Sequence, residues 1–175
     1  MIVYTDGLQK HTHYYFQRVG SAAVGFIGNQ ETFIAQLGLE GKVKVYNVEL
    51  TEILIGLYCA QSEAEKHPLI NHIIIYSDNI SALTTICDPQ PRKDQILAYD
   101  FYRNAIRWLE QSDIHQLTLA WCPSHLNIHG NERADKLAKS AIDLPEEIDT
   151  TTSHMLCRAW EYISKTWTKI WKNHP

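Results

Sequence analysis

The chain has 175 residues, 45% of them hydrophobic and 21% charged, which is the composition of one ordinary globular domain with its own core. Its longest apolar runs are far shorter than the roughly 20 residues that cross a bilayer, so the sequence excludes a membrane-spanning protein and we expect no membrane partner. Sixteen basic and twenty acidic residues leave a net charge of −4, which excludes strong nonspecific attraction of the whole domain to nucleic acid but allows a local basic strip.

Three strand candidates open the chain. The β-branched and aromatic run at residues 2–5 ends at Asp6-Gly7, a pair typical of turns, and residues 17–28 and 31–39 are two further candidates. A Gly-Asn-Gln connection between the last two is typical of hairpins, so we expect an antiparallel three-stranded meander. Because the first strand begins with no lead-in, we also expect a domain that belongs to a longer protein.

Helices and strands alternate through the rest of the chain. The candidates, in chain order, are a long helix over 47–66, a buried strand over 73–77, a short helix over 79–87, a helix over 93–111, a strand over 117–121 and a helix over 131–142. We expect Asn131 to cap the last of these helices. A strand followed by a helix implies a parallel neighbour, so the order predicts an α/β domain with helices packed on a mixed sheet.

The clearest boundary in the chain follows residue 145. A polar, Thr-rich stretch predicts a linker there, and the residues beyond it predict a helix with Trp160, Trp167 and Trp171 on one stripe. We therefore divide the chain into a domain over 1–145 and a linker with a tryptophan-bearing helix over 146–175. The stripe either packs on the parent domain, which we favour, or binds a partner.

Four carboxylates stand where this arrangement would bring them together. Asp6 and Asp78 follow strands, Glu49 lies in the first turn of the long helix, and Asp135 lies near the start of the last core helix. Singly, each has a simpler role as a turn residue, a helix cap, a partner of the helix dipole or a surface charge. Together they would repel one another unless cations neutralised them, and hard oxygen ligands select Mg²⁺ or Mn²⁺. The cluster therefore predicts a divalent metal site at the edge of the sheet.

Four segments of the chain resemble the motifs of type 1 ribonuclease H domains. They are Tyr4-Thr5-Asp6-Gly7, Val48-Glu49-Leu50, Tyr76-Ser77-Asp78-Asn79 and residues 121–135, WCPSHLNIHGNERAD. The last segment is the most specific, because His125 and Asp135 stand ten residues apart with Gly-Asn-Glu between them. The resemblance covers about residues 1–143 and is greatest to the domains of reverse-transcribing elements, especially non-LTR retrotransposon polyproteins.

The resemblance implies a ribonuclease H-like fold, a five-stranded mixed sheet flanked by helices, with the tryptophan-bearing helix added at the C-terminus. It also implies a metal-dependent endonuclease that hydrolyses the RNA strand of RNA/DNA hybrids by a two-metal-ion mechanism. The carboxylates that would hold two Mg²⁺ ions, with Mn²⁺ as an alternative, are Asp6, Glu49, Asp78 and Asp135. His125 would also be catalytic, through proton transfer or product release rather than permanent metal ligation.

The expected substrate contacts lie near these residues. Gly7 follows the first carboxylate, and Asn79 and Glu49 are placed to distinguish a 2′-hydroxyl from its absence. Lys42 and Lys44 would hold the phosphates of the DNA strand, or else they are ordinary solvated lysines. We expect the partners to be an RNA/DNA hybrid and a reverse transcriptase domain in the same polyprotein, because the chain has no extended basic protrusion of its own.

The isolated domain is expected to be a monomer, and an intracellular one because no secretory signal opens the sequence. Two other functions remain open: a noncatalytic tether or nucleic-acid-binding module of the same fold, and a DDE-type integrase or transposase. Retention of all four carboxylates favours the enzyme over the tether. The position of Glu49 on the long helix and the spacing of His125 and Asp135 disfavour the integrase.

Overall fold

The computed structural model describes residues 1–11, 17–39, 45–89, 96–124 and 126–145. Its elements, in chain order, are β1 (Ile2–His11), β2 (Gln17–Ile27), β3 (Gln30–Leu39), α1 (Val45–Lys66), β4 (His72–Ser77), α2 (Ile80–Cys87), α3 (Ile96–Glu110), β5 (Gln116–Trp121) and α4 (His129–Ala141). The predicted tryptophan-bearing helix lies outside the described residues. Within the described ranges, no helix is both long and apolar enough to span a bilayer.

The strands form one five-stranded mixed sheet in the order β3-β2-β1-β4-β5. β1 to β3 pair antiparallel, and β4 is parallel to both β1 and β5. The meander and the ribonuclease H-like sheet are therefore confirmed. Gly28 adopts a φ of 60° in the turn between β2 and β3, a left-handed conformation that glycine accepts without steric cost.

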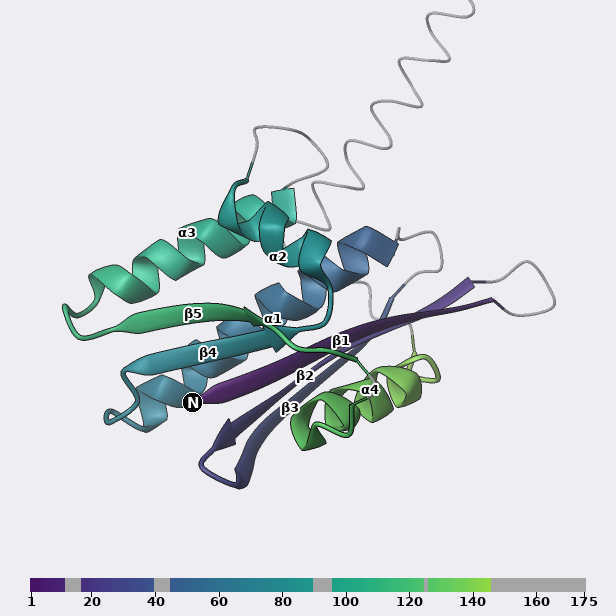
Figure 1. Cartoon of the computed structure of the whole chain (residues 1–175), viewed down its shortest axis with the longest axis horizontal. Helices are drawn as coiled ribbons and strands as arrows, with labels where there is room; N and C mark the ends of the chain where they lie inside the picture. Colours follow the sequence, from purple (N-terminus) through teal and green to yellow (C-terminus); the bar gives the residue numbers. More distant parts are fainter. Residues whose placement is uncertain (12–16, 40–44, 90–95, 125, 146–175) are drawn as a thin grey trace, which may run out of the picture.

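Helices cover both faces of the sheet (Figure 1). Because strand side chains alternate between faces, Val3 packs with the core under α1 and α3, whereas Tyr4 packs with the smaller core under α4. The larger core holds the apolar side chains of α1, α2 and α3 together with Ile73 and Ile75 of β4. The sheet thus carries α4 alone on one face and the other three helices on the opposite side (Figure 1).

Two predicted boundaries were wrong. β1 does not end at Asp6-Gly7 but continues to His11, because β2 pairs with it along that whole length. Asn131 does not cap α4: the helix begins at His129 after Ile128, so Asn131 is already its third residue and is buried.

The shifted starts of α1 and α4 also move two carboxylates. Because α1 begins at Val45, Glu49 lies in its second turn rather than its first. Because α4 begins at His129, Asp135 lies near the middle of that helix. Gly130 explains the early start of α4, since a Cβ there would lie 2.1 Å from the Tyr4 ring, and only glycine lets the first turn rest on β1 so closely.

Candidate carboxylate site

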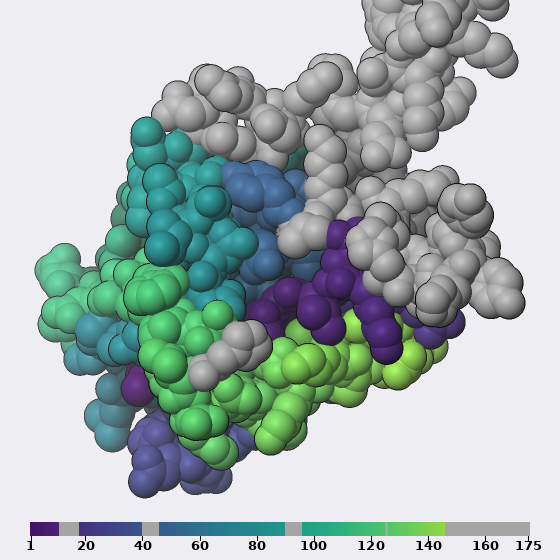
Figure 2. Space-filling model, turned by 45° about the vertical axis from the view of Figure 1, so that its right-hand side comes forward, coloured from purple at the N-terminus to yellow at the C-terminus, as the bar shows by residue number. Residues whose placement is uncertain are grey.

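The four predicted carboxylates come from four elements that meet where β4 ends. β1 pairs with β4 only over Ile2–Tyr4, so Asp6 extends past the end of β4, and Asp78 directly follows that strand. Glu49 comes from α1 on one face of the sheet and Asp135 from α4 on the other. In the space-filling view, β1 in purple reaches the surface between α1 in blue and α4 in green (Figure 2).

Asp6 is a partly buried carboxylate with three other carboxylates around it. Burial is the largest cause, and together with repulsion from Asp78, Asp135 and Glu49 it raises the pKa of Asp6 from 3.8 to about 8. A hydrogen bond from the backbone N–H of Gly7 opposes this shift. Asp6 therefore lies within electrostatic reach of the other three carboxylates.

Glu49 is almost fully buried, with 7% of its surface exposed. Burial, followed by repulsion from Asp78, raises its pKa from 4.5 to about 7. A hydrogen bond from the Asn79 side-chain amide and the contact with Glu52 limit the increase. Glu49 is thus a buried acid whose charge is favoured by Asn79 and opposed by burial and by Asp78.

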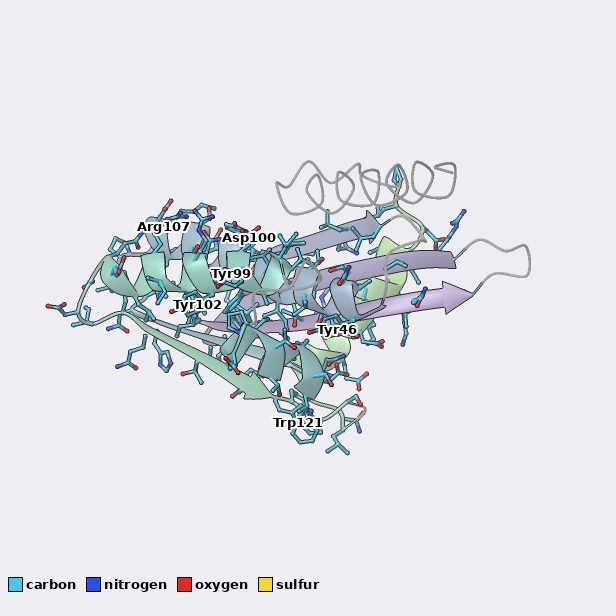
Figure 3. The ribbon with its side chains drawn as sticks, turned by 90° about the horizontal axis from the view of Figure 1, so that it is seen from above. Tyr46, Tyr99, Asp100, Tyr102, Arg107 and Trp121 are labelled. Carbon is cyan, nitrogen blue, oxygen red and sulfur yellow. The ribbon has the colours of Figure 1, made fainter. Side chains whose placement is uncertain are left out.

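The segment around Asp78 is held by hydrogen bonds from two sides. Asn79 caps α2, its Oδ1 accepting from the backbone N–H of Ala82 at 2.9 Å. Trp121, at the end of β5 in Figure 3, donates from Nε1 to the carbonyl of Asp78 at 3.0 Å. The Asp78 backbone is therefore fixed between the start of α2 and the end of β5.

α1 and α2 are joined by a polar contact near the site. The hydroxyl of Tyr46, labelled near the start of α1 in Figure 3, lies 2.5 Å from Thr85 Oγ1 on α2. Because Glu49 follows Tyr46 within one helical turn, this contact also limits how far Glu49 can move from Asp78.

Asp135 is tied to its own helix and α4 is tied to the sheet. Lys139 Nζ donates to Asp135 Oδ2 at 2.5 Å, one turn further along α4. Arg133 makes two hydrogen bonds with the Glu31 carboxylate of β3, at 3.0 and 3.2 Å. The second pair holds α4 over the sheet, and the first partly neutralises the carboxylate that faces Asp6.

The donor chemistry of the cluster fits a divalent metal. Within the described part of the chain, no three His, Cys, Asp or Glu side chains stand close enough to form a ready-made metal centre. Burial and mutual repulsion nevertheless raise the pKa values of Asp6 and Glu49 to about 8 and about 7. A hard cation such as Mg²⁺ or Mn²⁺ would allow all of them to ionise, and carboxylate oxygens are the ligands it prefers.

The remaining predicted residues are placed in part. Lys42, Lys44 and His125 lie outside the described residues. Asn79 uses its oxygen for the α2 cap and its amide for Glu49, so a contact with substrate stays a prediction. Gly7 has a packing reason of its own, because a Cβ there would lie 2.6 Å from Glu52 Oε2.

Glu52 is the polar residue of this region that the sequence analysis missed. It is fully buried, accepts a hydrogen bond from Thr5 Oγ1 at 3.1 Å and contacts Glu49. The sequence gives no clear signal for this role, because an acid between apolar residues of a helix is usually exposed.

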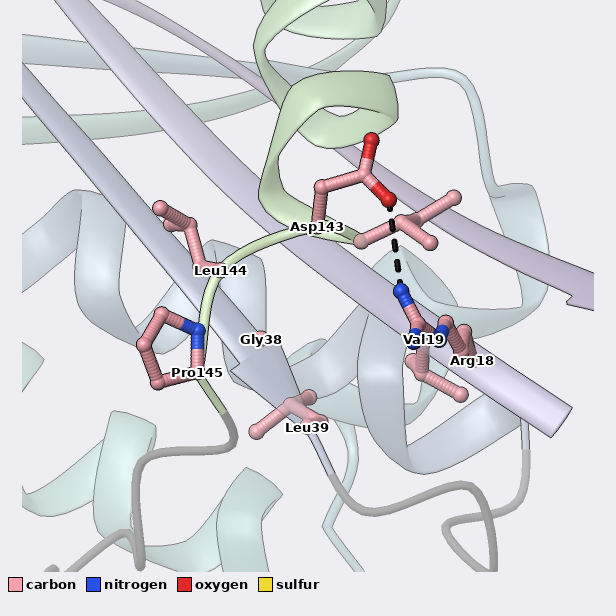
Figure 4. Close-up of a pocket in the computed structure, with 8 residues that line it drawn as sticks. Arg18, Val19, Gly38, Leu39, Asp143, Leu144 and Pro145 are labelled. Carbon is pink, nitrogen blue, oxygen red and sulfur yellow. Dashed lines mark hydrogen bonds and ion pairs between the residues drawn. The ribbon is translucent and has the colours of Figure 1, made fainter. Parts of the chain in front are cut away.

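A shallow pocket lies away from these carboxylates, where β2 begins and α4 ends (Figure 4). Val19, Gly38 and Leu144 contribute to its lining, and at its rim Arg18 Nη1 lies 3.3 Å from Asp143 Oδ1. Both charged side chains are more than half exposed, so this ion pair contributes little to stability. None of the four predicted carboxylates lines this pocket.

Comparison with known families adds an independent observation. The family model of RNase H matches residues 1–143. A search of curated proteins finds no match.

Several solved structures share the fold at low sequence identity. A foamy viral protease-reverse transcriptase in complex with an RNA/DNA hybrid has a TM-score of 0.63 and 13% identity over 81% of this chain and 20% of that chain. LC11-RNase H1, from compost, in complex with an RNA/DNA hybrid, has a TM-score of 0.57 and 17% identity over 81% of this chain and 96% of its own. RNase H1 from Halobacterium salinarum has a TM-score of 0.54 and 18% identity over 81% of this chain and 96% of its own. The chain thus spans about a fifth of the foamy viral protein.

Proposed function

The chain belongs to the ribonuclease H family and is a ribonuclease H, and we propose that it hydrolyses the RNA strand of RNA/DNA hybrids with two divalent metal ions. The residues that would hold the metals are Asp6, Glu49, Asp78 and Asp135. When bound, the metals would supply the Lewis acidity that makes water a nucleophile near neutral pH and offsets charge on the leaving 3′ oxygen. We take the ribonuclease H domain as residues 1–145, with the linker and tryptophan-bearing helix over 146–175.

The gathering of four carboxylates in a partly buried site is the observation that carries this proposal. Burial, followed by repulsion from Asp78, Asp135 and Glu49, raises the pKa of Asp6 to about 8. A set of acids gathered from four elements is unfavourable unless cations join it. The site also lies at an open end of the sheet, where a long nucleic acid can reach it.

The remaining site residues have supporting roles in the proposal. His125 moves a proton or assists product release, and Lys42 and Lys44 hold phosphates of the DNA strand. Gly7 and Asn79 lie beside the carboxylates, where the two strands of a hybrid would be distinguished by the presence of the 2′-hydroxyl.

We also propose that the domain works within a retroelement polyprotein, as an intracellular protein and a monomer when isolated. One similar fold is part of a protease-reverse transcriptase bound to a hybrid, and LC11-RNase H1 was likewise solved with a hybrid. These structures support a hybrid as the substrate and a reverse transcriptase domain as the covalent neighbour. Non-LTR retrotransposons are the source that the Asp78-Asn79 motif favours.

The test is cleavage of an end-labelled RNA, presented as a single strand, as an RNA duplex and as an RNA/DNA hybrid, with Mg²⁺ or with chelator. Wild type should cut the hybrid alone and only with Mg²⁺, and Asp78→Asn should not cut although it stays folded. Asp143→Asn is the matched control, because it makes the same chemical change at an exposed carboxylate far from the cluster.

Each result of this assay separates two functions. If wild type binds the hybrid but does not cleave it, the domain is a noncatalytic tether rather than an enzyme. Cleavage that survives Asp78→Asn would contradict the assignment of the site. Unfolding of Asp78→Asn, seen in its circular dichroism spectrum, would show that Asp78 is structural rather than catalytic.

A further inference from the structure

Glu52 is a buried ionisable side chain that the proposed chemistry does not use. It lies on α1 one turn after Glu49, and its exposed fraction is 0%. Burial, followed by repulsion from Glu49 and Asp6, raises the pKa of Glu52 well above its ordinary value. An acid in the core is costly unless hydrogen bonds compensate for its lost hydration. Its partners therefore indicate what it does.

On the side of the sheet, Glu52 contacts both residues that flank Asp6. Its Oε1 accepts a hydrogen bond from Thr5 Oγ1 at 3.1 Å, and the same hydroxyl lies 3.3 Å from the carbonyl of Tyr76 on β4. Its Oε2 lies 2.6 Å from the point that a Cβ on Gly7 would occupy. Since strand residues alternate between faces, Thr5 and Gly7 face α1 and Asp6 faces the other way. Glu52 thus supports β1 directly behind Asp6.

On the side of its own helix, Glu52 lies beside Glu49, because Glu52 Oε2 and Glu49 Cδ lie 2.6 and 3.6 Å from the same point, the position that a Cβ on Gly7 would occupy. Each of the two acids has a buried Oε2 with no hydrogen-bond partner among the described residues. Glu52 therefore contacts one proposed metal ligand directly and reaches the backbone of another through Thr5.

We propose that Glu52 is a positioning residue of the metal site, which sets the separation of Asp6 and Glu49 by accepting a hydrogen bond from Thr5 while packing against Gly7 and Glu49. Glu52 is not a ligand in this proposal, because a fully buried carboxylate leaves no room for a metal with its waters and a phosphate. Loss of a group that orients metal ligands typically weakens metal affinity about 10- to 100-fold. The inference rests on the proposed function, since it needs metals at Asp6 and Glu49.

The experiment measures melting of the full chain against Mg²⁺ concentration in wild type, Glu52→Leu, Glu52→Gln and Thr5→Val. Leu removes the hydrogen bond to Thr5 and the polar group beside Glu49, whereas Gln retains an acceptor for Thr5 and a polar group beside Glu49. Val removes the Thr5 hydroxyl alone and serves if Glu52→Leu does not fold. Mg²⁺ that binds only the folded chain raises Tm with concentration, so the titration reports affinity without an activity assay. Ile53→Val, at a buried neighbour on the same helix, is the matched control for lost stability.

We expect Glu52→Leu to need about tenfold more Mg²⁺ than wild type for the same increase in Tm. Thr5→Val should also need more Mg²⁺. Glu52→Gln and Ile53→Val should stay within about threefold of wild type. A wild-type Mg²⁺ dependence in both Glu52→Leu and Thr5→Val would overturn the proposal and leave Glu52 with a purely structural role. Loss of affinity in Glu52→Gln equal to that in Glu52→Leu would overturn it too, because the charge of Glu52 would then bind the metal. If the wild-type Tm ignores Mg²⁺, the metal site itself is wrong, and the hybrid cleavage assay decides separately whether the chain is an active ribonuclease.

Discussion

Replacing Asp6 with Asn should stabilise the metal-free protein at mildly alkaline pH and lose this effect in acid. Burial, followed by repulsion from the neighbouring carboxylates, raises the pKa of Asp6 from 3.8 to about 8 in the folded chain. A group whose pKa is raised by folding favours the native state fully below its unfolded pKa, and this contribution is lost as the pH rises through the folded pKa. An ionised Asp6 therefore opposes folding near pH 8, and an amide of the same shape removes that opposition.

The size of the effect follows from the same shift. A difference of about 4 pKa units corresponds to roughly 5 kcal/mol at about 1.36 kcal/mol per unit. Part of the shift comes from Asp78, Asp135 and Glu49, which share the proton, so we expect about 3 kcal/mol from the single substitution. For a domain of this size that corresponds to an increase in Tm of roughly 6 to 12 °C.

The assay is thermal unfolding of wild type and Asp6→Asn followed by circular dichroism in chelator, over a series from about pH 4 to about pH 8. The gain in Tm should shrink steadily toward acid pH. Asp143→Asn should change Tm little at any pH, because the carboxylate that it removes is exposed and its ion pair with Arg18 is weak. Equal Tm values for wild type and Asp6→Asn at the alkaline end would refute the claim that burial and repulsion oppose the ionisation of Asp6. A gain in Tm that does not depend on pH would refute it too.

Three further outcomes test the site and its support. Mg²⁺ should raise the Tm of wild type and raise it less in Asp6→Asn, which a melt with and without chelator measures. Gly130→Ala should destabilise the chain by about 2 kcal/mol, or roughly 4 to 8 °C in Tm, because its Cβ would lie 2.1 Å from the Tyr4 ring; an unchanged Tm would contradict this packing. Trp121→Phe should slow hybrid cleavage about fivefold through loss of the bond to the Asp78 carbonyl, an effect of about 1 kcal/mol, with kcat measured at saturating hybrid.

Strands and helices of this chain were predictable wherever their signal is local. The alternation that places Val3 under α1 and Tyr4 under α4 follows from the order of adjacent residues. The apolar spacing of α1 and the Gly28 turn are local signals of the same kind. The start of α4 was not predictable in this way. Asn131 is a good cap in isolation, but contact between Gly130 and a ring on β1 places the first turn earlier, and that contact joins distant parts of the sequence.

The candidate site divides along the same line. Asp6 and Asp78 could be predicted together because β1 and β4 are parallel neighbours, and the sheet topology places Asp6 beside the residue that follows the end of β4. Glu52 could not be predicted, because whether an acid on a helix faces solvent or core depends on what packs against the helix. Its partner Thr5 belongs to another element, and no spacing within α1 reveals that contact.

Gly7 shows that a glycine can be required for a reason other than the turn that the sequence predicts. In the sequence, Asp6-Gly7 is a turn signal, whereas the structure continues β1 through both residues to His11. The glycine is required because α1 packs so closely there that a Cβ would lie 2.6 Å from Glu52 Oε2. A turn and a close approach of two elements both select glycine, and only the packing distinguishes them. The missing Cβ at position 7 and the buried acid at position 52 are therefore a single structural feature, which brings Glu49 close to the strand that carries Asp6.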